Sequence, residues 1–90
     1  MTQNSKITVK KAKLKHVPFV LKTEYIKLDN LLKAAGAVNT GGHAKIVIVG
    51  GEVKVNSAVC TQRGKKLRPG DTAEYGLTVY EITAEIQDDN

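Results

Sequence analysis

The sequence predicts an α+β fold in which two short helices pack on a small antiparallel sheet. Two helical patterns lie near the middle of the chain, and segments with a period of two lie on both sides of them. Ninety residues are enough for one small domain. Three tyrosines, one phenylalanine and no tryptophan leave the core to valine, isoleucine, leucine and alanine. We therefore expect a small aliphatic core.

The first expected element is a basic strand within residues 6–22. Lysines alternate with apolar residues in this segment, which indicates a strand with one polar face. Pro18 cannot donate a backbone hydrogen bond, so it favours an edge position or a break in the strand.

Residues 26–35 predict the first helix. Apolar residues at positions 28, 31, 32 and 35 fall on one helical face. Asp29 lies in the first turn and Lys33 in the last, where the helix dipole favours an anion and a cation respectively. Gly36 is suited to the left-handed conformation that ends many helices.

Residues 41–49 predict a second helix that follows closely on the first. Thr40 is suited to cap its N-terminus. Ala44, Val47 and Ile48 share one face, while the β-branched residues lower the intrinsic helix propensity, so that packing must hold the helix. The glycine pair at 50–51 ends it.

From Glu52 the period becomes two, which predicts a hairpin and further strands. The Asn56-Ser57 pair provides the hairpin turn, and Pro69-Gly70-Asp71 is a strong turn signal. In order, the expected segments are a strand before the hairpin turn, a returning strand at 58–61, a basic loop at 62–68, and strands at 72–76 and 80–86.

The net charge of +5 is unevenly distributed. Residues 1–23 carry six lysines and no acid, whereas residues 72–90 carry five acids and no base. A basic body favours a polyanionic partner, although solubility alone would also explain it. The N-terminal lysines could contact such a partner or pair with the acidic closing strand; the candidate pairs join Lys11, Lys13 and Lys15 to Glu81 and Glu85.

Other function classes find little support in the sequence. Residues 41–45 read GGHAK, which lacks the spacing of a nucleotide-binding loop. The lone Cys60 and the separated His16 and His43 form no metal-ligand cluster. No apolar run is long enough to span a membrane, and the N-terminus does not read as a signal peptide, so we expect a cytoplasmic protein with no cofactor.

Two segments could contact phosphate groups. Gly41 and Gly42 would present backbone N–H groups at a helix N-terminus, close to Lys45. The run RGKKLR, residues 63–68, holds four cations in six residues. It is either a solvated loop or an edge that contacts a nucleic-acid backbone.

Several short motifs occur in one order from residue 26 onward. They are KLD at 27–29, an alanine at 44 in the second predicted helix, GEVKVN at 51–56 and KLRPGD at 66–71. Together, over residues 24–76, they resemble the S4 RNA-binding domain family, in particular the small stand-alone bacterial S4 proteins of the YaaA and YbcJ type.

The resemblance implies an S4-like (αL) fold, in which two helices and the following hairpin form an L-shaped surface for structured RNA. It implies no catalytic residue and no metal. The residues that it implies as RNA contacts are Lys27, Lys33, Thr40, Gly41, Lys45, Lys54, Asn56, Arg63, Lys65 and Lys66.

Three positions depart from the family pattern. Ser57 stands where glycine usually completes the hairpin turn, which puts the turn geometry in question. His43 replaces a usual acid and makes the surface more basic. Gln62 replaces a common basic residue and removes one expected contact.

The hypothesis is a basic N-terminal strand or extension at 1–23, an S4-like RNA-binding domain at 24–86 and a frayed acidic tail at 87–90. We expect non-catalytic binding of structured RNA of the rRNA or tRNA class, with association with the ribosome as one expected setting. The scarcity of aromatic residues favours folded RNA over single strands, which are bound largely by stacking. The alternative is a protein-interaction module that docks an acidic or DNA-associated partner.

Overall fold

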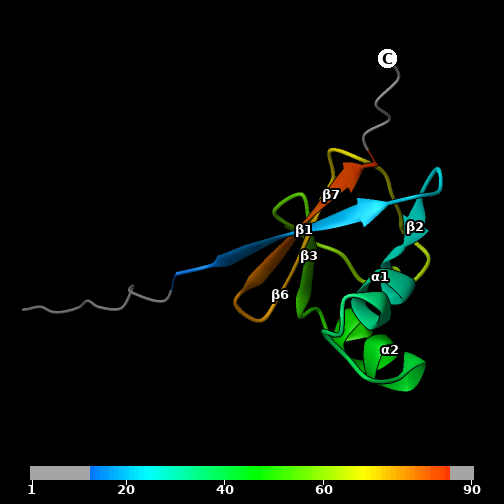
Figure 1. Ribbon diagram of the computed structural model, residues 1–90. Coiled ribbons are helices and arrows are strands. Elements are labelled where there is room, and N and C mark those ends of the chain that lie inside the picture. The colour runs from blue at the N-terminus through cyan, green and yellow to red at the C-terminus, as the bar shows by residue number, and fades with distance from the viewer. Residues whose placement is uncertain (1–12, 86–90) are drawn as a thin grey trace, which may run out of the picture.

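The computed structural model describes residues 13–85, which form two helices and seven strands (Figure 1). Predictions for Lys11 and for the tail at 87–90 lie outside these residues. The elements are β1 (Lys15–Leu21), β2 (Ile26–Lys27), α1 (Leu28–Ala34), α2 (Gly41–Val49), β3 (Val53–Val55), β4 (Ala58–Val59), β5 (Lys66–Leu67), β6 (Thr72–Tyr75) and β7 (Thr78–Ala84).

The main sheet has five strands in the order β1-β7-β6-β3-β4. Strands β3, β4, β6 and β7 pair antiparallel, as predicted, but β1 pairs parallel with β7. The sheet is therefore mixed. Nearly the whole described chain separates β1 from β7, so no short turn forces these two strands to run antiparallel.

The edge position predicted from Pro18 is confirmed, because β1 ends the sheet. Of the two roles considered for the N-terminal lysines, pairing with Glu81 and Glu85 is not formed by Lys13 or Lys15. The register places Lys15 opposite Thr78, while His16 Nδ1 lies 2.8 Å from Glu81 Oε2. Because β1 and β7 run parallel, Lys15 lies beside the first residue of β7, whereas Glu81 lies three residues further along that strand.

Helix α1 begins two residues later than predicted, at Leu28. The preceding pair, Ile26–Lys27, forms β2 and pairs antiparallel with β5. Gly36 has a φ of 76°, which confirms the predicted left-handed stop. The predicted buried face is confirmed for its three leucines, since each is completely buried.

Helix α2 has the predicted bounds, Gly41–Val49. The Thr40 hydroxyl accepts a hydrogen bond from the His43 N–H at 3.0 Å, so the predicted N-cap is confirmed. The predicted apolar face of Ala44, Val47 and Ile48 is buried.

The hairpin of β3 and β4 keeps the tight turn expected of an Asn-Gly pair although serine replaces glycine. Asn56 has a φ of 50° and Ser57 a φ of 73°. Positive φ at both central positions is typical of a type I′ turn.

One hydrophobic cluster joins the helices to the sheet. Both helices and strands β1, β3, β5, β6 and β7 contribute buried apolar side chains to it. The two helices pack against each other and lie together at one end of the molecule, below the sheet in Figure 1. The predicted α+β class and the packing of two short helices on a sheet are confirmed.

Candidate nucleic-acid interface

The basic loop, residues 62–68, follows β4, includes β5 and is attached to the first turn of α1. The Leu28 N–H donates to the Lys65 carbonyl at 2.9 Å, and the Asp29 N–H donates to the Arg63 carbonyl at 3.1 Å. The N-cap residue Lys27 makes no side-chain capping bond. Loop carbonyls therefore satisfy the first two N–H groups of α1, which have no acceptor within the helix. This arrangement fixes the loop cations relative to α1.

A second contact holds Arg63. Its Nη2 lies 3.6 Å from Asp29 Oδ2, while 46 % of the Arg63 side chain stays exposed. The other carboxylate oxygen, Asp29 Oδ1, is buried and has no hydrogen-bond partner among the described residues. Asp29 also lies in the first turn of α1, where the helix dipole favours its negative charge. The guanidinium is thus held through one nitrogen, while the exposed part of the side chain remains available to a ligand.

The short ribbon of β2 and β5 places two lysines side by side. Lys27 is the direct cross-strand partner of Lys66, and both are exposed. The neighbouring pair joins Ile26 to the completely buried Leu67, which anchors the ribbon in the core. Like charges directly opposite each other destabilise a strand pair. A bound anion would relieve that repulsion.

Tyr25 orders two cations beside this ribbon. The Lys66 Nζ lies 4.8 Å and the Arg68 Cζ 5.5 Å from the centre of its ring. Both distances are within the range of cation–π attraction. Sequence reasoning missed Tyr25. The available signal was an aromatic residue directly before β2, the strand that pairs with β5 in the basic loop.

A second group of predicted contacts lies at the N-terminus of α2. A methyl group placed on Gly41 would be 3.9 Å from the Lys33 Nζ, so this ammonium lies beside the start of the helix. Lys45 follows one turn later and is exposed. Thr40 serves as the N-cap, and the N–H groups at the start of a helix have no intrahelical acceptor. Cations and backbone donors therefore meet at this end of α1 and α2.

Lys54 lies apart from these groups. Val53 and Val55 on either side of it are buried, so the strand pleat sends the Lys54 side chain to the opposite face of the sheet. Its cross-strand partners there are Glu74 and Val59.

Asn56 is engaged within the protein. Its Oδ1 accepts from the Thr72 N–H at 3.0 Å, and its Nδ2 donates to Asp71 Oδ1 at 3.1 Å. These bonds tie the hairpin turn to the Pro-Gly-Asp turn. The structure thus gives Asn56 a positioning role.

Asp71 completes that connection. Its Oδ2 accepts the Arg68 N–H at 2.8 Å. This backbone hydrogen bond, together with the one from Asn56 and the positive charges of Lys65 and Arg68, lowers the pKa of Asp71 below its ordinary value. An ionised Asp71 therefore holds the end of the basic loop in place.

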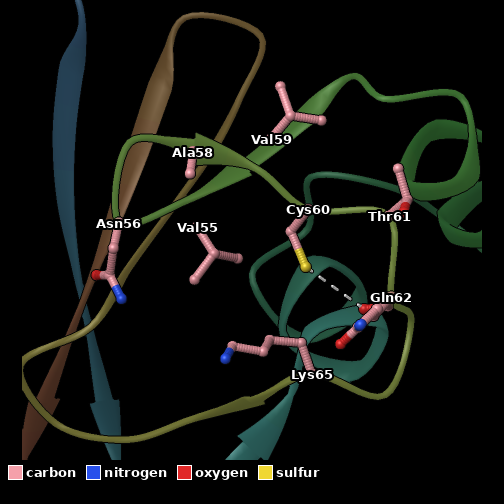
Figure 2. A pocket seen from close by; sticks show the side chains of 8 residues that line it. All are labelled: Val55, Asn56, Ala58, Val59, Cys60, Thr61, Gln62 and Lys65. Carbon is pink, nitrogen blue, oxygen red and sulfur yellow. Dashed lines mark hydrogen bonds between the residues drawn. The ribbon is translucent and has the colours of Figure 1, made fainter.

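A hollow of about 320 Å³ lies between the hairpin and the basic loop (Figure 2). Its apolar walls include Val55, Ala58 and the half-buried Cys60. Gln62 and Lys65 supply polar groups from the loop.

Residues 13–85 contain neither a metal-ligand cluster nor a membrane-spanning helix. No group of three or more His, Cys, Asp or Glu residues is arranged to hold a metal ion within this part of the chain. None of its helices is long and apolar enough to cross a membrane.

Comparison with known proteins gives consistent matches. The family model of the S4 domain matches residues 19–83. The probable ribosome maturation protein RlbA of Bacillus subtilis is 40 % identical over 57 residues, which cover 63 % of this chain and 80 % of RlbA. The putative RNA-binding protein YbcJ of Escherichia coli is 39 % identical over 63 residues, covering 70 % of this chain and 90 % of YbcJ.

A solved structure agrees with these matches. The solution structure of E. coli YbcJ, described as revealing an ALFAL motif involved in RNA binding, superposes with a TM-score of 0.57 and 28 % sequence identity. The match covers 88 % of this chain and 99 % of the YbcJ chain.

Proposed function

The chain belongs to the S4 domain family, and on that premise we propose that it binds structured RNA without catalysing a reaction. Two relatives support the proposal by their descriptions, one as a putative RNA-binding protein and one as a probable ribosome maturation protein. We further propose RNA of the rRNA or tRNA class as the target, bound in the cytoplasm.

The observation that carries the proposal is the way the basic loop is built. Its cations project from a backbone that caps α1, and within the described residues only Arg63, of all lysines and arginines, lies within ion-pair distance of a carboxylate. Exposed cations on a rigid edge can displace counterions from a phosphate backbone, which drives nucleic-acid binding.

The two groups of cations suit a helical backbone better than a point ligand. Lys27 precedes α1 and Lys33 lies in its last turn, about 9 Å apart along the helix axis. Double-stranded and folded RNA is recognised mostly through its shape, its phosphates and its 2′-hydroxyls. The ring of Tyr25 already contacts Lys66 and Arg68, which favours this mode over stacking on single-stranded bases.

A salt titration tests the electrostatic basis. We expect the logarithm of the binding constant for a folded RNA to fall linearly with the logarithm of salt concentration. A slope near zero would contradict the proposed surface.

Alanine variants locate the surface. Replacing Lys45, Arg63, Lys65 and Lys66 together should weaken binding at least about tenfold at 0.1 M salt and reduce the steepness of the salt dependence by about 3. The control replaces two exposed lysines outside the predicted face, Lys15 at the start of β1 and Lys22 directly after its end. Circular dichroism would verify that both variants fold. Equal losses in the two variants would mean that the predicted face is wrong.

A competition experiment distinguishes RNA binding from the alternative function, a protein-interaction module for an acidic or DNA-associated partner. An acidic polypeptide or duplex DNA should displace the RNA only at much higher concentration. Displacement at equal charge concentration would instead favour a module for an acidic or DNA-associated partner.

A further inference from the structure

The hollow between the hairpin and the basic loop adjoins the proposed RNA surface. Its volume of about 320 Å³ is at the lower end of the range of small-molecule sites, roughly 300–1,000 Å³. Figure 2 shows the side chains of Val55, Cys60 and Gln62 turned toward the space that Lys65 borders from below. The walls therefore come from β3, the end of β4 and the loop, all elements of the candidate interface.

The lining combines apolar side chains with the polar side chains of Asn56, Thr61, Gln62 and Lys65. Val55, Ala58 and Cys60 present carbon and sulfur. The Gln62 carbonyl accepts from the Lys65 N–H at 3.2 Å and more weakly from Cys60 Sγ at 3.9 Å, which orders the loop backbone. The Gln62 side-chain amide makes no hydrogen bond to any other described residue, so it can donate to and accept from a ligand.

Cations border the hollow without filling it. Lys65 lines it, and Arg63 follows Gln62 immediately in the loop. Phosphate groups held by these side chains would bring the sugars and bases between them to the mouth of the hollow. The Asn56 amide at the rim is already bonded to Asp71 and Thr72, so the hollow offers apolar carbon, the free Gln62 amide and adjacent cations. These features match a flat heterocycle whose two neighbouring phosphates remain outside.

We propose that this hollow receives one unpaired nucleobase of the bound RNA. The inference rests on the proposed function and adds a position at which the surface distinguishes RNA sequence or secondary structure. Bases in bulges and loops are unstacked and can be turned outward, whereas paired bases cannot enter. The Gln62 amide suits a base edge that offers a donor beside an acceptor, as adenine does.

The first experiment compares three RNA hairpins that differ at one position. One is fully paired, one carries a single bulged adenosine, and one carries an abasic bulge. The wild-type protein should bind the adenosine bulge about tenfold more tightly than either other hairpin, the lower part of the range for one well-placed base contact. This ratio should not change with salt, because the phosphate charge is nearly the same in all three.

The second experiment uses variants of the hollow. Ala58→Leu should fill it and Gln62→Ala should remove its amide, so each should abolish most of the preference while affinity for the paired hairpin stays within about twofold. The matched control is Val20→Leu on β1, because Val20 is an exposed valine that does not line the hollow. Thermal unfolding would verify that each variant folds. If Ala58→Leu does not fold, Gln62→Ala alone tests the base site.

The outcomes separate this inference from the proposed function. Salt-sensitive binding with equal affinity for all three hairpins would overturn the base site and leave RNA binding standing. An abasic bulge bound as tightly as adenosine, or a preference that survives both variants, would also overturn it. Failure to bind any hairpin would overturn the proposed function and the base site with it.

Discussion

Asp71 connects two turns through its two carboxylate oxygens. Oδ1 accepts from Asn56 in the hairpin turn, and Oδ2 accepts from the Arg68 N–H at the end of the basic loop. Its backbone N–H also donates to the Arg68 carbonyl at 2.9 Å. One ionised side chain therefore positions both the hairpin and the loop.

The lowered pKa of Asp71 predicts a loss of stability in acid. The folded-state pKa lies below the ordinary 3.8, chiefly because of the Arg68 hydrogen bond. The stabilisation is therefore present above about pH 4 and is lost as pH falls through the folded pKa. Urea unfolding between pH 7 and pH 2.5 should show this loss, and Asp71→Asn should flatten it.

Asn56→Ala provides the control for that measurement. It removes one partner of Asp71 but leaves the Arg68 N–H, so the acid-dependent loss should become smaller without disappearing. If Asp71→Asn loses stability as steeply as the wild type, other carboxylates cause the acid sensitivity.

Tyr25 should matter for binding more than for folding. Tyr25→Leu keeps an apolar side chain but removes the aromatic ring that holds Lys66 and Arg68. We expect RNA affinity to fall about two- to fivefold, as for the loss of exposed cation–π contacts. Tyr25→Phe keeps the ring and should bind like the wild type. If both variants lose the same RNA affinity, the Tyr25 hydroxyl, and not the ring, is responsible for the effect.

At the scale of elements, the hairpin turn holds avoidable strain. Ser57 has a φ of 73°, a conformation that costs residues with a side chain about 1–2 kcal/mol. Ser57→Gly should therefore raise the free energy of unfolding by up to about 1 kcal/mol, after the larger backbone entropy of glycine is deducted. Chemical denaturation would measure the change. Ser57→Ala is the control and should give no gain; a gain in both variants would exclude strain as the cause.

The elements that sequence could predict are those with complete local signals. Helix α2 has a cap at Thr40, one apolar face and a terminal glycine pair, and its bounds were predicted correctly. The ribbon of β2 and β5 is only two residues on each side, and such short strands show no periodicity. Its formation depends on burial of Leu67, which is a tertiary effect.

The sequence was sufficient to predict which residues give the candidate site its positive charge, but not how these residues are arranged in space. The run RGKKLR indicated a basic edge, but the capping of α1 by loop carbonyls involves no side-chain signal. Asn56 and Lys54 were expected on the surface from the family motif. Both are exposed, but the strand pleat turns Lys54 to the opposite face of the sheet and Asn56 is hydrogen-bonded to Asp71, and both features depend on which strands pair.

For the whole molecule, β1 and the helices share one core. Leu21 at the end of β1 is 5 % exposed and belongs to the same cluster as the α1 and α2 side chains. Parallel pairing with β7 places this strand in the fold although it is far away in the sequence. Leu21 therefore attaches β1 to the core of the domain.

Leu21→Ala should destabilise the entire domain. We expect a cost of about 2–5 kcal/mol and a single unfolding transition by denaturant, because a cavity in a shared core weakens all of its elements. The adjacent Val20→Ala is the matched control, since Val20 is 51 % exposed, and it should cost less than about 0.5 kcal/mol. Two separate transitions would show that β1 unfolds independently.

The capping of α1 by the basic loop also limits how this surface can change during evolution. Exposed loops usually tolerate insertions. Here the carbonyls of Arg63 and Lys65 must reach two successive N–H groups of α1, while Leu67 stays in register with Ile26. An insertion between Gln62 and Lys66 would leave the helix start uncapped or shift that register. Related proteins are thus expected to vary the side chains of this loop freely while they keep its length.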